Sequence, residues 1–115
     1  MRCLLLALVM LGTALPTSAA PMRCDITKKF ACNPGGCRET KGTIWNLVDF
    51  KAQRFSRCDK KGCDHYTISR SESGIYVNIT VPDRAMFAKM SRDGSEYVEV
   101  VSLGTNVLVS YGSCK

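Results

Sequence analysis

The sequence predicts an all-β domain, a small antiparallel meander that closes into a barrel or a sandwich and is stapled by disulfides. From residue 43 onward, seven short segments rich in β-branched and aromatic residues follow one another, separated by turn-forming residues. The chain of 115 residues also holds seven cysteines. In a small exported domain, such cysteines form a disulfide framework.

Residues 1–20 have the order of a secretory signal peptide. Arg2 precedes an apolar run over residues 4–11, and small residues follow at 18–20. We expect cleavage after Ala20. The run is shorter than the about 20 residues that a membrane-spanning helix needs, and no later stretch approaches that length. The sequence therefore predicts a secreted or periplasmic protein without a membrane span.

The next segment, residues 21–42, shows no sustained hydrophobic period. It contains the turn-forming run "NPGG" (33–36) between two cysteines. We interpret it as a cysteine-tied N-terminal loop or short strand. It forms one domain with residues 43–115.

Residues 43–115 contain the seven candidate strands of the β-domain. Each is bounded by residues such as Gly, Pro, Asp or Ser, which favour turns for distinct backbone reasons. The candidate strands cover 43–50, 53–58, 65–70, 74–81, 85–90, 96–103 and 106–111. The segment 85–90 is also compatible with a helical turn, because Ala, Met and Lys favour helix.

Alternation of apolar and polar residues predicts which side chains face the interior. In "IYVNITV" (75–81), the odd-numbered residues are apolar and share one face, as a half-buried strand requires. The same pattern places Tyr111 inside and puts Tyr76 and Tyr97 on the outer face. Periodicity alone does not separate a barrel from a sandwich.

Cleavage after residue 20 removes one cysteine and leaves six, which permit 15 pairings. The six are Cys24, Cys32, Cys37, Cys58, Cys63 and Cys114. In "RCDKKGCDHY" (57–66), a four-residue turn would place Cys58 opposite Cys63 in an antiparallel pair. Their Cα atoms would then be about 4.5–5.5 Å apart, within the about 4.4–6.8 Å that a disulfide spans.

The same geometry favours one further pair, and elimination gives the last. Cys32 and Cys37 flank the "NPGG" turn at the same spacing, which leaves Cys24 to pair with Cys114. That last bridge would close a loop of about 90 residues, worth about 4–5 kcal/mol in the chain-entropy model.

A zinc site is the alternative for these cysteines. Two C-x4-C pairs, with His65 close to the second, approach the ligand spacing of structural zinc sites. An exported protein meets an oxidising compartment, which favours disulfides over zinc thiolates. We therefore predict no metal and no other cofactor.

The positive charge of the chain lies in its first half. The formal net charge is +6; residues 21–61 hold ten basic and four acidic side chains, whereas residues 62–115 hold five basic and six acidic ones. A basic surface suits an anionic polysaccharide, lipid headgroup or nucleic acid. Besides Lys28 and Lys29, the candidate residues are Lys51, Arg54, Arg57, Lys60 and Lys61. Because Arg54 and Arg57 differ in strand parity, we expect them on opposite faces.

The single histidine supports an alternative function, a small secreted hydrolase or nuclease. His65 would act as acid or base with Asp49, Asp59 or Asp64. The sequence contains no G-x-S-x-G elbow, no H-E-x-x-H motif and no phosphate loop. If all six cysteines are oxidised, no thiolate nucleophile remains. These observations favour a non-catalytic protein.

Three phrases in order, "RCDKKGCDHY", "SGIYVNI" and "EYVEVVSLGTNVLVSYGSC", resemble a group of small exported, cysteine-containing bacterial proteins without assigned function. This resemblance covers about residues 43–114 and implies no catalytic or binding residue. A second resemblance, through "RCD" (57–59), "SGIY" (73–76) and the late Cys114, is to the periplasmic lysozyme inhibitors, which are small disulfide-tied β-barrels. It implies a third function, a periplasmic enzyme inhibitor. An inhibitor of a cationic lysozyme should present an acidic surface, unlike this basic chain.

The sequence as a whole favours an exported, non-catalytic binding or envelope-associated module. Its basic first half is the expected contact for an anionic ligand. Ligand identity and oligomeric state do not follow from the sequence.

Overall fold

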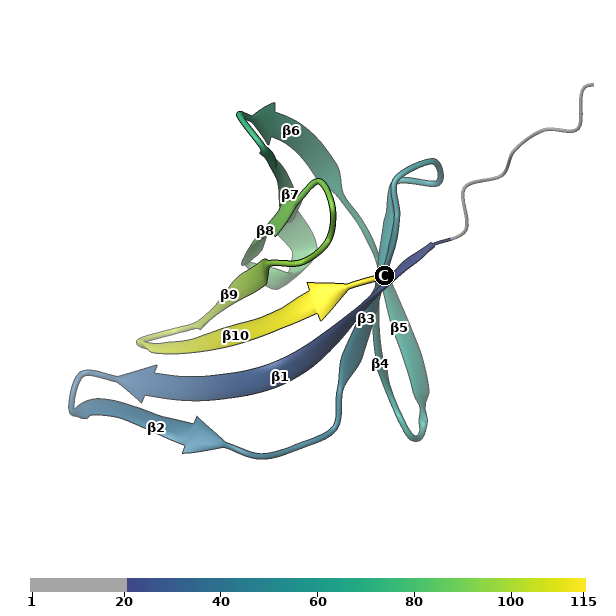
Figure 1. Cartoon of the computed structure of the whole chain (residues 1–115). Coiled ribbons are helices and arrows are strands. Elements are labelled where there is room, and N and C mark those ends of the chain that lie inside the picture. Colours follow the sequence, from purple (N-terminus) through teal and green to yellow (C-terminus); the bar gives the residue numbers. More distant parts are fainter. Residues whose placement is uncertain (1–20) are drawn as a thin grey trace, which may run out of the picture.

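The structure, a computed structural model, describes residues 21–115; the predicted signal peptide over 1–20 lies outside the described residues. Within them, ten strands form one antiparallel sheet that curls into a nearly closed barrel (Figure 1). The strands are β1 (Met22–Asn33), β2 (Gly36–Thr40), β3 (Trp45–Asp49), β4 (Arg54–Asp59), β5 (Gly62–Thr67), β6 (Ser69–Ser73), β7 (Tyr76–Val81), β8 (Met86–Ser91), β9 (Tyr97–Leu103) and β10 (Asn106–Cys114). A 3-10 turn, η1 (Pro82–Arg84), follows β7. The predicted all-β, antiparallel class is confirmed.

The strands are ordered β5-β4-β3-β1-β10-β9-β8-β7-β6, and β2 pairs with β1 beside this path. The N-terminal and C-terminal strands therefore lie side by side in the middle of the sheet (Figure 1). The segment 85–90, which is compatible with either a helical turn or a strand from its sequence, belongs to β8 for most of its length.

The interpretation of residues 21–42 as a loop or short strand is wrong. Twelve of these residues form β1, which pairs with three neighbours, and five more form β2. The physical reason is a β-bulge between Ile26 and Lys28, which shifts the register against β10. A bulge inserts one extra residue into the strand. The side chains that face the interior are therefore even-numbered before the bulge, such as Cys24 and Ile26, and odd-numbered after it, such as Lys29. A period-2 pattern does not persist along such a strand.

The ladder of the barrel is interrupted between its two edge strands, β5 and β6, which do not pair with each other. Ile68, between these strands, is buried, and its N–H donates to the carbonyl of Gln53 at 3.0 Å. On the same side of the molecule, the Arg84 guanidinium from η1 lies over the Tyr66 ring, 5.2 Å from its centroid. The hydrogen bond of Ile68 extends the β4–β5 pairing by one residue pair, and the contact between Arg84 and Tyr66 packs η1 against β5 across the interruption.

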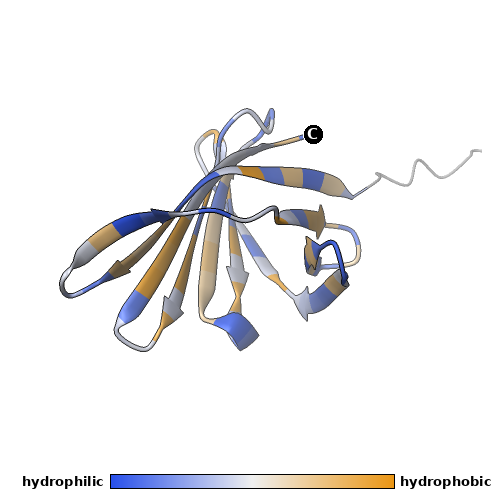
Figure 2. Ribbon diagram, turned by 90° about the horizontal axis from the view of Figure 1, so that it is seen from below, coloured by the Kyte–Doolittle hydropathy of each residue, from blue (hydrophilic) through white to orange (hydrophobic). Residues whose placement is uncertain are grey.

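The interior is filled mainly by apolar side chains from opposite walls. Along the strands, apolar and polar residues alternate, as Figure 2 shows. Among the largest fully buried side chains are Val48, Phe55, Ile79, Val81 and Met90. Of the odd-numbered residues predicted to face inward, Val77, Ile79 and Val81 of β7 are buried, whereas Ile75, in the turn before β7, is 65% exposed.

Two further predicted orientations are wrong. Tyr111 is 47% exposed, and its strand instead buries Ser110 and Cys114. Tyr97 is buried in the interior, whereas Tyr76 is partly exposed on the outer face, as predicted. Both strands β9 and β10 carry apolar residues on both faces, so alternation does not identify the inner one.

Three disulfides staple the barrel. They join Cys24 to Cys114, Cys32 to Cys37 and Cys58 to Cys63, with Cα atoms 3.9–4.0 Å apart. These are the pairs predicted from hairpin geometry and, for Cys24 and Cys114, by elimination; the Cα atoms are closer than the predicted separation of about 4.5–5.5 Å. Each joins residues directly opposite in the register, within the β1–β2 hairpin, within the β4–β5 hairpin, and between β1 and β10.

The turn between β8 and β9 is fastened by one carboxylate. Asp93 Oδ1 accepts hydrogen bonds from the Ser95 N–H at 3.0 Å, the Ser95 hydroxyl at 2.7 Å and the Ser91 hydroxyl at 2.8 Å. These bonds, led by the one from the Ser95 N–H, lower the pKa of Asp93 to about 2. The turn also packs against the chain end, because a Cβ on Gly94 would lie 2.4 Å from the Cys114 carbonyl oxygen.

We expect Asp93 to give the protein an acid-dependent stability. Its pKa is about 2 when folded and about 3.9 when unfolded, so its stabilising contribution is present above about pH 4 and is lost as the pH falls towards about 2. Urea unfolding measures the free energy of unfolding at several pH values in this range. This free energy should depend less on pH in Asp93→Asn than in the unchanged protein, because asparagine retains an acceptor oxygen but does not titrate. Asp83→Asn is the control, because Asp83 makes no side-chain hydrogen bond within residues 21–115. Equal pH dependence in all three proteins would contradict this assignment.

Candidate anion-binding hollow

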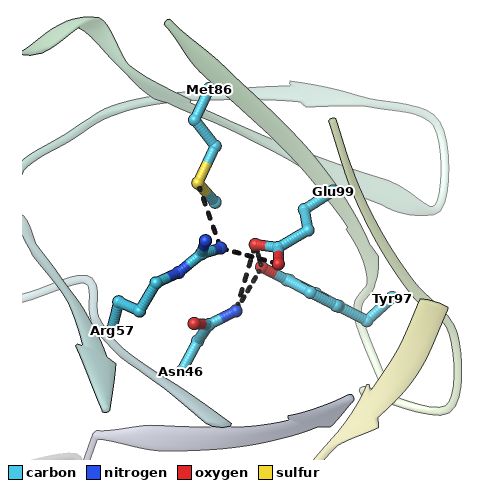
Figure 3. A network of polar contacts seen from close by, with 5 residues as sticks. All are labelled: Asn46, Arg57, Met86, Tyr97 and Glu99. Carbon is cyan, nitrogen blue, oxygen red and sulfur yellow. Dashed lines mark hydrogen bonds and ion pairs between the residues drawn. The ribbon is translucent and has the colours of Figure 1, made fainter. Parts of the chain in front are cut away.

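A polar cluster lies inside the otherwise apolar barrel (Figure 3). Glu99 is 1% exposed and accepts hydrogen bonds from Arg57 at 2.7 Å, from Asn46 at 3.1 Å and from the Tyr97 hydroxyl at 3.0 Å. The buried carboxylate is thus held by one cation and two neutral donors. Burial of a charge requires such compensation.

The Tyr97 phenol acts only as a neutral donor and acceptor in this cluster. Burial is the largest cause that raises its pKa well above the usual range, followed by the negative charge of Glu99. Tyr97 therefore keeps its proton for Glu99 and accepts a hydrogen bond from Asn46 at 3.1 Å. Arg57 is committed to this interior arrangement, with its side chain 22% exposed.

The five candidate anion-binding residues do not form one patch. Lys51 and Arg54 lie at one end of the β4–β5 hairpin, in or next to the turn after β3, whereas Lys60 and Lys61 lie at its opposite tip. Arg57 faces inward towards Glu99, while Arg54 is exposed, so the predicted difference in orientation of these two arginines is confirmed.

Lysines from β1 and from the segment after β2 instead surround a hollow at the base of the β1–β2 hairpin. Its volume is about 280 Å³. The lining side chains include three lysines and one carboxylate, namely Lys28, Lys29, Lys41 and Glu39. The pairing of Lys29 with Thr40 in the β1–β2 register brings these segments together. The hollow is therefore cationic.

Lys29 is the lysine most affected by this environment. Its pKa is lowered, first by burial and then by the positive charge of Arg57, and is raised in part by Glu99. Lys29 forms no ion pair within 4.0 Å among residues 21–115. Two cations, Lys29 and Arg57, thus share the field of a single buried carboxylate, which is already hydrogen-bonded to Arg57.

A hydroxyl group without a partner lies beside the lysines. Thr40 Oγ1 is buried and has no hydrogen-bond partner within the described part of the chain, and Thr40 lines the hollow. Buried polar atoms are nearly always hydrogen-bonded. The Thr40 hydroxyl is therefore available to donate a hydrogen bond to a group that enters the hollow. Periodicity could not identify this set, because it depends on the hairpin register. The signal in the sequence was limited to the adjacent Lys28 and Lys29.

The motif "RCDKKGCDHY" lines a different hollow, of about 330 Å³, whose charges balance. The basic Arg57 and Lys61 face the acidic Asp59 and Asp64 there. On the outside of the same hairpin, Ser56 Oγ and His65 Nδ1 are 2.6 Å apart. These residues are directly opposite in the register.

This contact does not resemble an accessible nucleophile with its base. Ser56 is only 4% exposed, and within the described chain no hydrogen bond or ion pair joins His65 to an acidic side chain. A catalytic serine needs an accessible hydroxyl and an oriented base. The contact is better explained as a cross-strand hydrogen bond that stabilises the hairpin.

The cysteines that a zinc site would require are bonded to one another. Within residues 21–115, no three side chains of His, Cys, Asp or Glu gather as ligands for a metal ion. None of the helical structure in that part of the chain is long and apolar enough to cross a bilayer.

Comparison with family models, with curated proteins and with solved structures found no match to this chain. The charge and geometry of the hollow therefore carry the functional conclusion.

Proposed function

We propose that the protein is an exported, non-catalytic binding module that holds an anionic group in the hollow at the base of the β1–β2 hairpin. The observation that carries this proposal is the combination of three lysines, one carboxylate and an unpartnered hydroxyl around one hollow. Lys28, Lys29 and Lys41 supply positive charge, and Thr40 supplies a hydrogen bond. The disulfides fit the oxidising compartment in which an exported protein works.

An oxyanion is the chemical group that best complements this hollow. Its negative charge would offset the repulsion between Lys29 and Arg57 and would return the lowered pKa of Lys29 towards its usual value. Its oxygens would accept hydrogen bonds from lysine ammonium groups and from the Thr40 hydroxyl. Lysine binds such groups as a compact point charge.

The proposed ligand is an acidic polysaccharide, in which carboxylates or sulfates repeat along a polymer. Exposed lysines Lys28 and Lys41 at the rim can contact neighbouring anionic groups of the polymer, while the half-buried Lys29 contacts one within the hollow. Repeated contacts along one chain raise the overall affinity without a deep pocket.

Binding to polygalacturonate is expected to weaken between about 50 and 200 mM salt, because lysine contacts release counterions from a polyanion. The double variant Lys29→Gln/Lys41→Gln should bind about tenfold more weakly. The slope of the logarithm of its binding constant against the logarithm of salt concentration should be shallower by about two, one for each lysine removed. The matched control is Lys51→Gln/Lys60→Gln, which removes the same net charge outside the hollow. Titration calorimetry at several salt concentrations measures both quantities.

Salt-independent binding, or equal losses in the two double variants, would contradict the proposal. Polyphosphate and single-stranded DNA serve as further probes. Tighter binding of either probe than of polygalacturonate would support an anion-binding site but contradict the proposal that its ligand is a polysaccharide.

A further inference from the structure

A second groove lies on the outer face of the sheet, next to the lysine hollow. It has a volume of about 390 Å³ and crosses strands β7 to β10. Val98 lies between Tyr111 and Lys89 in the register, and Tyr76 lines the groove from β7. The groove therefore has an apolar floor flanked by two tyrosines. Its size falls in the range of small-molecule sites, about 300–1,000 Å³.

Contacts with neighbouring side chains hold both tyrosine rings in place. The Tyr111 ring is 47% exposed and rests edge-on against Phe30, with centroids 6.4 Å apart. The Tyr76 hydroxyl donates to Glu96 at 2.9 Å, and the Lys89 ammonium lies 5.6 Å from the centroid of the Tyr76 ring. Rings that are fixed before binding lose little conformational entropy when a ligand packs on them.

The polar groups of the groove carry opposite charges that balance. The Lys89 ammonium is able to donate hydrogen bonds and the Glu96 carboxylate to accept them, and both lie beside Tyr76. A charged ligand would be attracted by one of these groups and repelled by the other. A neutral ligand with many hydroxyls can bond to both, because each hydroxyl is a donor and an acceptor.

We propose that this groove is a second binding site, and that it takes a neutral carbohydrate. The ring of a sugar has an apolar C–H face, which would pack on Tyr111 and Tyr76, and hydroxyls at its edge, which would bond to Lys89 and Glu96. The groove complements a neutral sugar better than a lipid headgroup or an acidic polymer, because its two charges cancel. The inference rests on other observations than the lysine hollow does, although the two sites are neighbours: Thr27 lines both, and Lys28 lies opposite Tyr111 in the register.

Isotope-labelled protein should be titrated with cellohexaose, maltohexaose and the hexamer of N-acetylglucosamine, with shifts of the backbone amides as the readout. At least one of the three is expected to bind, with its largest shifts on β8, β9 and β10 around the groove. Tyr111→Ala is expected to weaken that binding about tenfold or more, as truncation of a central aromatic contact does.

Phe87→Ala is the matched control, because Phe87 is an aromatic residue of the same outer face, 45% exposed, and does not line the groove. Urea unfolding of both variants verifies that they are folded. Failure of all three sugars to bind, tighter binding of hexagalacturonate at this groove, or equal losses in Tyr111→Ala and Phe87→Ala would each overturn the inference.

Discussion

Replacing both Cys24 and Cys114 by alanine is expected to lower the free energy of unfolding by about 4–5 kcal/mol. The bridge joins residues 90 positions apart, and the entropy that such a cross-link removes from the unfolded chain grows with the length of the closed loop. Both sulfurs are also buried in the core cluster, so their removal leaves a cavity as well. For a domain of this size, the loss is a large share of the total stability.

The matched comparison is Cys32→Ala/Cys37→Ala, which opens a bridge between residues only five positions apart. The same loop-length relation predicts a loss of about 2 kcal/mol for this pair. Guanidinium unfolding under non-reducing conditions measures both values. Equal losses would show that contacts between β1 and β10, rather than the cross-link, hold the chain ends together.

The position of the Cys24–Cys114 bridge in the sheet adds a reason for its large expected effect on stability. It ties β1 to β10, the two strands in the middle of the sheet, and the Lys115 N–H donates to the Arg23 carbonyl at 2.8 Å beside it. β1 also carries Lys28 and Lys29 of the hollow. The bridge therefore fixes the strand on which the proposed anion site depends.

Local patterns in the sequence were enough to predict the meander and the hairpin disulfides. Cys58 and Cys63 lie across one turn, so their pairing needs only local geometry. The long-range bridge between Cys24 and Cys114 follows by elimination, because these two cysteines remain once the local pairs are assigned. Strand β1 itself was missed, since the bulge after Ile26 interrupts the alternation by which strands are recognised.

The orientation of β10 could have been inferred from Cys114. A disulfide between two central strands is buried, and Ser110 shares the parity of Cys114. Hydrophobicity favoured Tyr111 instead, because the outer face of β10 also carries apolar residues and because the interior holds the polar Glu99, which lies opposite Ser110. Where the interior holds polar side chains, the more apolar face of a strand is not always the face that points inward.

The hollow could not be predicted in the same way. Neighbours in sequence, such as Lys60 and Lys61, were grouped with Lys51, although the hairpin separates them. The lysines that do meet come from β1 and from the segment after β2, and their meeting requires the hairpin register. Sequence distance is a poor guide to a surface that several strands share.

Replacing Glu99 by alanine is expected to cost about 3–5 kcal/mol of stability. The change leaves the partly buried Arg57 without its counter-charge, and it removes the acceptor for Asn46 and for the Tyr97 hydroxyl. Loss of one partner from a buried ion pair is costly, because the remaining charge stays desolvated and unpaired. Unpaired buried donors add a further penalty. Equilibrium unfolding of Glu99→Ala in urea measures the loss directly.

The double variant Arg57→Ala/Glu99→Ala distinguishes an unpaired charge from a general packing defect. With both groups absent, no charge remains in the interior cluster, so the double variant should lose no more stability than Glu99→Ala alone. Ser110→Ala is the control, because Ser110 is buried directly opposite Glu99 in the register but forms no side-chain hydrogen bond with it among the described residues. If the losses of Arg57→Ala and Glu99→Ala were additive, the two side chains would act independently, and their 2.7 Å contact would not stabilise the barrel.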